Sequence, residues 1–127
     1  MSTNKILIVE DEAVVSLDIA RRLEKMGYEV LARVASGEEA LELVQETPPD
    51  LVLMDINLQG KLDGIETATQ LNQEYDLPVI YLTAYAGEST LERAKKSKPY
   101  GYILKPFKER ELCAAIEIAI SRHQGES

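Results

Sequence analysis

LVLMDINLQGKLDGI, residues 51–65, is the stretch that decides the predicted fold. Its first four residues, Leu51 to Met54, are apolar without alternation, which is typical of a strand covered on both faces. Asp55 follows immediately in the same register. The stretch therefore predicts a buried, central strand, and it indicates that something at the end of this strand requires a negative charge.

The length and composition favour one domain, expected to span residues 1–127, with a core large enough to need no disulfide or metal staple. The formal net charge of −8 opposes binding to nucleic-acid phosphates or to anionic membrane surfaces. The apolar runs are too short to span a bilayer, and no signal-like segment precedes the first predicted strand. The single cysteine, Cys113, suits a reducing compartment. We therefore expect a cytoplasmic chain that binds neither nucleic acid nor membranes.

Strand-sized apolar stretches alternate along the chain with segments of helical periodicity. The expected strands are residues 5–9, 29–35, 51–55, 78–83 and 101–105. The expected helices are residues 13–26, 36–45, 64–75, 88–97 and 108–122. This alternation predicts an α/β fold with a parallel sheet, helices on both of its faces and right-handed crossovers.

The apolar pattern also predicts where each element lies. The first, third and fourth strands are almost continuously apolar and should be central, whereas the second alternates, contains Arg33 and should lie nearer an edge. The fourth helix has few apolar residues, so we expect it to be the least firmly anchored. In the first helix, the expected inward stripe consists of Val14, Leu17, Ala20, Leu23 and Met26.

Polar side chains stand at the carboxyl ends of four predicted strands. They are Glu10 and Asp11 after the first, Asp55 at the end of the third, Thr83 at the end of the fourth and Lys105 at the end of the fifth. In an open parallel sheet, ligands bind outside the carboxyl ends of the strands. We therefore expect three carboxylates, a hydroxyl and an ammonium group to converge at one edge.

Such a cluster has a recognisable chemistry. Crowded carboxylates repel one another unless a cation joins them, and Mg²⁺ prefers oxygen ligands and binds carboxylates together with phosphate oxygens. Lys105 and Thr83 could then bind phosphoryl oxygens, and Asp55 could attack phosphorus. Singly, each residue is ordinary: a helix cap, a β-branched strand residue or a solvated lysine. The prediction therefore depends on the fold bringing all of these residues to the same edge of the sheet.

Several motifs in a fixed order carry a family resemblance. ILIVEDE, LVLMDINL, DGI, VIYLTA and YGYILKPF resemble the receiver domain of two-component response regulators, of the chemotaxis-regulator type, over essentially the whole chain. The separations of Asp11 from Asp55 and of Thr83 from Lys105 are also typical of that family. The resemblance implies a flavodoxin-like three-layer α/β/α sandwich with a five-stranded parallel sheet in the order 2-1-3-4-5.

The resemblance also implies roles for the residues at the strand ends. Asp55 would accept a phosphoryl group from a phosphohistidine of a histidine kinase or phosphotransfer protein, and Thr83 and Lys105 would contact the phosphoryl oxygens. The implied Mg²⁺ ligands are Glu10, Asp11, Asp55 and the backbone carbonyl of Asn57. The chain would catalyse its own phosphorylation and dephosphorylation without turning over a separate substrate.

A conformational switch is implied as well. Thr83 would move toward the phosphoryl group and Tyr102 would turn inward, which reshapes the face made by the fourth helix, fifth strand and fifth helix, a possible dimer interface. The Lys105–Pro106 peptide bond would be cis. Only 20 residues follow Phe107, so we expect no effector domain in this chain, which either acts alone or belongs to a longer protein. The downstream target is unknown.

Two features depart from the common family pattern. The first acid is Glu10 rather than Asp, a longer arm that could reach a metal through water. The loop after Asp55 lacks the usual Met-Pro and is one residue longer than the commonest form. In addition, Tyr85 is bulky and could screen an acyl phosphate from water, so we expect slower loss of the phosphoryl group than with a small residue there.

Three other functions are compatible with parts of the sequence. A haloacid-dehalogenase-type phosphatase also uses a strand-end Asp nucleophile, but it usually has a second acid two residues later, where this chain has Asn57. An interaction module independent of phosphorylation normally loses one of the acceptor, metal or lysine positions. A flavodoxin-like nucleotide or flavin binder requires a phosphate-binding loop that the sequence lacks.

Overall fold

A parallel sheet with the strand order β2-β1-β3-β4-β5 runs through the computed structural model, which describes residues 4–58, 61–84 and 88–126. The strands within these residues are β1 (Lys5–Val9), β2 (Glu29–Val34), β3 (Leu51–Asp55), β4 (Val79–Thr83) and β5 (Gly101–Leu104). The predicted order is confirmed, with the continuously apolar strands in the centre and β2 and β5 at the edges.

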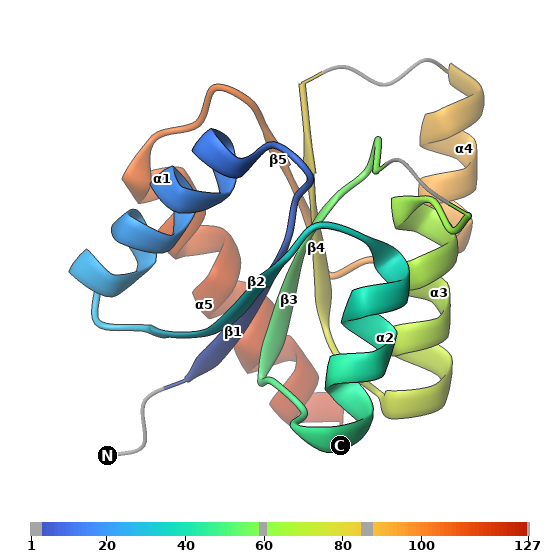
Figure 1. Ribbon diagram of the computed structural model, residues 1–127, viewed down its shortest axis with the longest axis horizontal. Helices are drawn as coiled ribbons and strands as arrows, with labels where there is room; N and C mark the ends of the chain where they lie inside the picture. Colours follow the sequence, from blue (N-terminus) through green and yellow to red (C-terminus); the bar gives the residue numbers. More distant parts are fainter. Residues whose placement is uncertain (1–3, 59–60, 85–87, 127) are drawn as a thin grey trace.

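Helices cover both faces of the sheet (Figure 1). They are α1 (Ala13–Lys25), α2 (Gly37–Glu46), α3 (Gly64–Tyr75), α4 (Glu88–Lys96) and α5 (Glu109–Glu126). α1 and α5 lie on one face, and α2, α3 and α4 lie on the other, as Figure 1 shows. The predicted three-layer α/β/α sandwich is therefore confirmed, and the helices α1 to α4 lie in the crossovers between successive parallel strands.

Two apolar clusters fill the space between the layers. Alternate residues of each central strand point to opposite faces, so Leu7 and Met54 belong to the cluster under α2 and α3, whereas Ile8 and Leu53 belong to the cluster under α1 and α5. All five residues of β3 are buried. The continuous apolar run of β3 thus has the expected cause: both faces of the strand are covered.

The inward stripe predicted for α1 is wrong in its first half. Val14 is 82% exposed and Leu17 is 39% exposed, while the buried residues of the helix are Ser16, Ile19, Ala20 and Leu23. A row with strict three-residue spacing drifts by about 60° per step around a helix of 3.6 residues per turn. Its first and fourth members, Val14 and Leu23, therefore lie on opposite sides of α1.

The C-terminal helix is longer than the sequence predicts. α5 continues to Glu126 rather than ending near residue 122. His123 explains the extension: its Nε2 lies 2.6 Å from the carbonyl oxygen of Asp76, and its ring packs edge-on against Tyr100. None of the described helices is long and apolar enough to cross a bilayer. The cytoplasmic location stays a prediction.

Candidate functional site

The backbone brings the predicted site residues to one edge of the sheet. The amide of Glu10 donates to the carbonyl of Val34, which extends the pairing of β1 and β2 by one step. The amide of Lys105 donates to the carbonyl oxygen of Thr83 at 2.8 Å, so these two residues lie side by side at the ends of β4 and β5. The expected convergence at the carboxyl edge is observed.

Three carboxyl groups form a cluster at this edge. One ligand oxygen each from Glu10, Asp11 and Asp55 lies within 4.8 Å of the others. Glu10 and Asp55 are buried, with 2% and 5% of their surface exposed, whereas Asp11 is exposed. The cluster therefore has a closed inner side and an open outer side, which gives a ligand access from solvent.

Lys105 neutralises part of this charge. Its Nζ lies 2.7 Å from Oε1 of Glu10, and the other oxygen of Glu10 accepts the amide of Glu12 at 3.2 Å. Burial alone would raise the pKa of Glu10, but the hydrogen bond and charge of Lys105 and the other donors outweigh it, so the pKa is lowered. Glu10 is thus held as a buried carboxylate, with a donor to each of its two oxygens.

The pKa of Asp55 is shifted in the opposite direction from that of Glu10. Burial, to which the neighbouring Glu10 carboxylate adds, raises the pKa of Asp55 to about 6, although the amide of Asn57 and the charge of Lys105 oppose the rise. The Asn57 amide donates to Oδ1 of Asp55 at 3.0 Å, which orients the carboxylate. An acid in this state becomes fully ionised once a cation binds beside it.

The Thr83 hydroxyl is buried at the strand edge. Its side chain is 2% exposed, and its hydroxyl makes no hydrogen bond to any described residue. A buried hydroxyl in that state is costly unless a ligand or water satisfies it. The hydroxyl is therefore available to a ligand at the strand edge.

The acidic cluster suits a hard divalent cation. Its donors are oxygen atoms, two of the three acids are buried, and the raised pKa of Asp55 marks the crowding that a cation would relieve. Mg²⁺ usually binds through one or two carboxylates and keeps several waters, which the exposed side at Asp11 permits. The residues present therefore fit such an ion.

Sequence reasoning missed the close approach of α3 to the end of β3. A Cβ atom at Gly64 would lie 2.1 Å from the carbonyl oxygen of Asp55, so only glycine fits there. Asp63 caps α3 by accepting the amide of Glu66, whose side chain accepts the amide of Asp63 in return. The spacing of Asp63 and Glu66 was a usable signal for this capping box. Together these contacts fix the start of α3 against the end of β3.

A groove lies on the other side of Lys105. The α1 groove, as we name it, has a volume of about 610 Å³ and runs between α1 and the segment after β5. Val14 and Leu17 line it from α1, and Lys105, Pro106 and Phe107 line it from the opposite wall. The Lys105–Pro106 peptide bond is cis, as the resemblance implied.

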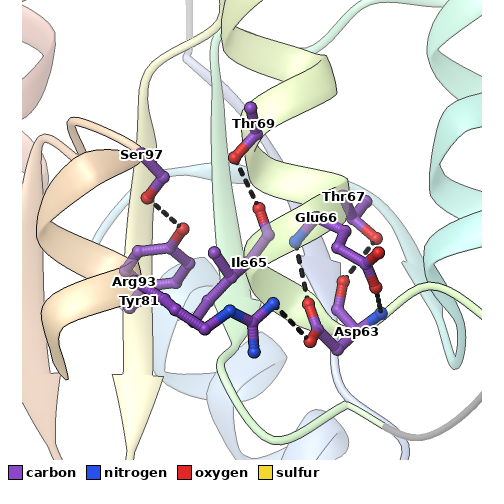
Figure 2. A network of polar contacts seen from close by, with 8 residues as sticks. All are labelled: Asp63, Ile65, Glu66, Thr67, Thr69, Tyr81, Arg93 and Ser97. Carbon is purple, nitrogen blue, oxygen red and sulfur yellow. Dashed lines mark hydrogen bonds and ion pairs between the residues drawn. The ribbon is translucent and has the colours of Figure 1, made fainter. Parts of the chain in front are cut away.

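The switch candidate Tyr102 lies on β5 with 38% of its surface exposed. Its ring centroid is 5.8 Å from that of Tyr81, its direct neighbour on β4. Figure 2 shows that the Tyr81 hydroxyl meets Ser97, just after α4, and that Arg93 of α4 pairs with Asp63. Tyr85, expected to screen the site, lies outside the described residues.

The fold and this edge define a class of protein. The chain matches the response regulator receiver domain over residues 6–117, and it belongs to that family. It is 38% identical over 118 residues to the transcriptional regulatory protein PdtaR of Mycobacterium tuberculosis (strain CDC 1551 / Oshkosh), covering 93% of this chain and 57% of that protein. The chain thus spans little more than half the length of this relative.

Solved structures agree with the assignment. The signal receiver domain of a modulated diguanylate cyclase from Desulfovibrio desulfuricans G20 is 38% identical, with a TM-score of 0.96 over 99% of this chain and 100% of that one. A CheY-like receiver domain protein from Methanospirillum hungatei JF-1 is 27% identical, with a TM-score of 0.90 over 99% of this chain and 100% of that one. The chain is therefore a signalling domain of the response regulator class, with the CheY-like fold.

Proposed function

We propose that this receiver domain accepts a phosphoryl group on Asp55 from a phosphohistidine of a histidine kinase or phosphotransfer protein. The observation that carries the proposal is the joint placement of Glu10, Asp11 and Asp55 at one strand edge with Lys105 beside them. Receiver domains bind Mg²⁺ at an acidic cluster. Here Asp11, Asp55 and the Asn57 carbonyl would hold the ion, with Glu10 contributing directly or through water.

Asp55 is the nucleophile in this mechanism. One carboxylate oxygen of Asp55 attacks phosphorus, the bond between phosphorus and the donor's imidazole nitrogen breaks, and the imidazole leaves with the bonding electron pair. Mg²⁺ supplies neutralisation of charge on the phosphoryl oxygens and on the carboxylates. The Asn57 amide keeps Asp55 oriented by its hydrogen bond to Oδ1.

Lys105 and Thr83 complete the phosphoryl site in this proposal. Lys105 carries a positive charge at the strand edge, and its ammonium group, which the contact with Glu10 positions there, can bind a phosphoryl oxygen. The hydroxyl of Thr83, which bonds to none of the residues that the structure describes, can donate to another phosphoryl oxygen. Bonding that hydroxyl would remove its desolvation cost, and this gain favours movement of Thr83 toward the phosphoryl group.

The α1 groove is the surface on which we expect the protein donor to bind. It begins at Lys105 and is lined by exposed apolar side chains, of which Val14 is 82% exposed. A donor helix in this groove would bring its imidazole to Asp55. Val14→Asp should slow transfer from a phosphorylated histidine phosphotransfer protein, yet leave phosphorylation by acetyl phosphate unchanged.

A second surface, around α4 and β5, is the proposed output surface. Leu91 of α4 and the β5 residues Tyr102 and Leu104 are 36%, 38% and 66% exposed. Phosphorylation would change this face through Thr83 and Tyr102, and a second copy of the chain is one partner that could bind there. Sedimentation of the phosphorylated and unphosphorylated protein measures that possibility.

The decisive experiment is intact mass measurement after incubation with acetyl phosphate and Mg²⁺. The wild type should gain one phosphoryl group, and Asp55→Asn should gain none. Asp50→Asn is the matched control, because Asp50 directly precedes the other end of β3 and its hydrogen bond from the Lys5 amide survives in the amide. An unmodified wild type would instead favour an interaction module that works without phosphorylation.

A further inference from the structure

Tyr81 is a buried tyrosine whose hydroxyl takes no part in the proposed phosphoryl site. The side chain is 0% exposed and lies in the apolar cluster that contains Ala94 of α4. On one side its ring contacts Tyr102, with centroids 5.8 Å apart and planes tilted by 47°. On the other side its hydroxyl reaches Ser97 (Figure 2). Tyr81 thus lies between the switch side chain and α4.

The direction of the hydrogen bonds can be deduced. Ser97 Oγ lies 2.6 Å from the carbonyl oxygen of Ala94, and because a carbonyl only accepts, the single proton of the Ser97 hydroxyl is used there. Tyr81 must therefore donate to Ser97 Oγ across their 2.6 Å contact. Burial raises the pKa of Tyr81 to about 12, which keeps this donor protonated. Two successive hydrogen bonds therefore run from the Tyr81 hydroxyl to Ser97 and from Ser97 to the carbonyl of Ala94.

This series of hydrogen bonds matters because few other contacts with buried residues hold the described part of α4 in place. Ala94 is the only buried residue of α4 among those whose side chains the structure describes. The ion pair between Arg93 and Asp63 also holds α4, but Arg93 is 51% exposed, and exposed pairs contribute little. The Tyr81 hydroxyl is therefore a buried polar link between the sheet and the C-terminal end of α4.

We propose that Tyr81 is a positioning residue that couples α4 to Tyr102. Tyr81 packs in the same apolar cluster as Ala94 of α4, and Thr83, two residues further along β4, lies on the same face of the sheet. A displacement of Thr83 or Tyr102 then reaches α4 through the ring and hydroxyl of Tyr81. The inference deepens the proposed function, since it names the route from the phosphoryl site to α4, but its first test requires neither metal nor phosphoryl group.

The first test is amide hydrogen exchange of the unphosphorylated protein. Tyr81→Phe removes only the donor hydroxyl, and Ser97→Ala removes the hydroxyl that links Tyr81 to the Ala94 carbonyl. Each should speed exchange of the amides of residues 91–97 about fivefold, the effect expected for one hydrogen bond. The double variant should be no faster than Ser97→Ala, because the two changes break the same series of hydrogen bonds.

The matched control is Thr69→Val, which removes a side-chain hydrogen bond to the Ile65 carbonyl on the neighbouring helix. It should leave exchange in α4 unchanged. The proposal is overturned if Tyr81→Phe leaves α4 exchange at the wild-type rate, or if the two substitutions act additively. Thermal melts of both single variants confirm that each is folded at the temperature of the measurement.

The second test follows coupling after acetyl phosphate and Mg²⁺ are added. In the wild type, NMR signals of the Tyr102 ring and of the α4 amides should shift together. In Tyr81→Phe, the Tyr102 signal should still shift, while the α4 shifts fall by at least half. Full-size α4 shifts would refute the coupling role. If Asp55 takes up no phosphoryl group, the proposed function fails, and hydrogen exchange alone decides the role of Tyr81.

Discussion

The ammonium nitrogen of Lys105 lies 2.7 Å from Oε1 of Glu10, whose side chain is fully buried. This ion pair stands directly beside Asp55, since Glu10 and Asp55 belong to the same carboxyl cluster. The pair therefore affects Asp55 in two opposite ways. The Glu10 carboxylate raises the pKa of Asp55, and the Lys105 ammonium lowers it.

Removing one partner at a time should separate these effects. We expect Glu10→Gln to lower the pKa of Asp55 and Lys105→Met to raise it, because the first removes a like charge and the second an opposite one. NMR titration of the Asp55 carboxyl carbon without divalent metal measures both. Lys25→Met is the control, since Lys25 pairs with Glu109 at the surface. Shifts in the same direction for both variants would contradict this account.

The raised pKa of Asp55 should make the metal-free protein less stable as the pH rises. The group is protonated more readily in the folded state, near pH 6, than at its ordinary value of 3.8, so the folded state binds the extra proton. Its contribution to the free energy of unfolding, at most about 3 kcal/mol, is fully present at low pH and is lost as the pH rises from about 4 to 6. The lowered pKa of Glu10 acts in the opposite direction, but only at lower pH.

Urea denaturation between pH 4.5 and 7.5 in EDTA checks this dependence. The wild type should lose stability across that range, and Asp55→Asn should lose less and be the more stable protein at pH 7.5. Asp50→Asn should follow the wild type, because Asp50 lies at the opposite end of β3. A flat wild-type profile would show that Asp55 ionises in the folded state without penalty.

Mg²⁺ should stabilise the folded protein by binding the acidic cluster. An ion at 100 times its dissociation constant adds about 2.7 kcal/mol if it binds only the folded state. Asp11→Asn should lose most of this gain, since Asp11 is the exposed acid of the cluster. Asp18→Asn, which removes an exposed charge on α1, should keep it. Thermal midpoints with Mg²⁺ and with EDTA give the comparison, and equal gains in both variants would place the ion elsewhere.

The sequence predicted features that follow from periodicity and register. Unbroken apolar runs identified the central strands, and the polar residue that ends each run then had to lie at the carboxyl edge, as Asp55 and Thr83 do. The stripe on α1 failed because three-residue spacing alone does not fix which side of a helix faces the sheet. Val14 consequently became part of an exposed groove instead of the core.

Tertiary contacts could not be predicted in the same way. Gly64 is required only because α3 begins against the carbonyl of Asp55, and no local pattern contains that approach. Tyr81 looked like one more apolar residue of a strand, although a buried tyrosine hydroxyl usually has a partner. Its partner Ser97 is separated from it by the whole of α4, so the pair depends on how that helix packs.

Gly64→Ala should destabilise the protein and disturb Asp55 together. The added Cβ would lie 2.1 Å from a backbone oxygen, which can move only with β3, so we expect a loss of about 1–3 kcal/mol. Phosphorylation by acetyl phosphate should slow in parallel. Gly125→Ala is the control, because it lies in α5 with no atom within 4 Å of the new Cβ, and it should be neutral or slightly stabilising. Equal stability of the two variants would contradict the close approach.

Asp63 combines two interactions that substitution can separate (Figure 2). Its Oδ1 caps α3 through the amide of Glu66, and its Oδ2 pairs with Arg93 of α4 at 2.8 Å. Asp63→Ala should cost about 1–2 kcal/mol, mostly from the cap. Arg93→Ala loses only a half-exposed ion pair and should cost less than about 1 kcal/mol. Asp63→Asn keeps a capping oxygen but not the charge, so it should match Arg93→Ala in urea denaturation. If Asp63→Asn proves as costly as Asp63→Ala, the charge and not the cap stabilises the start of α3.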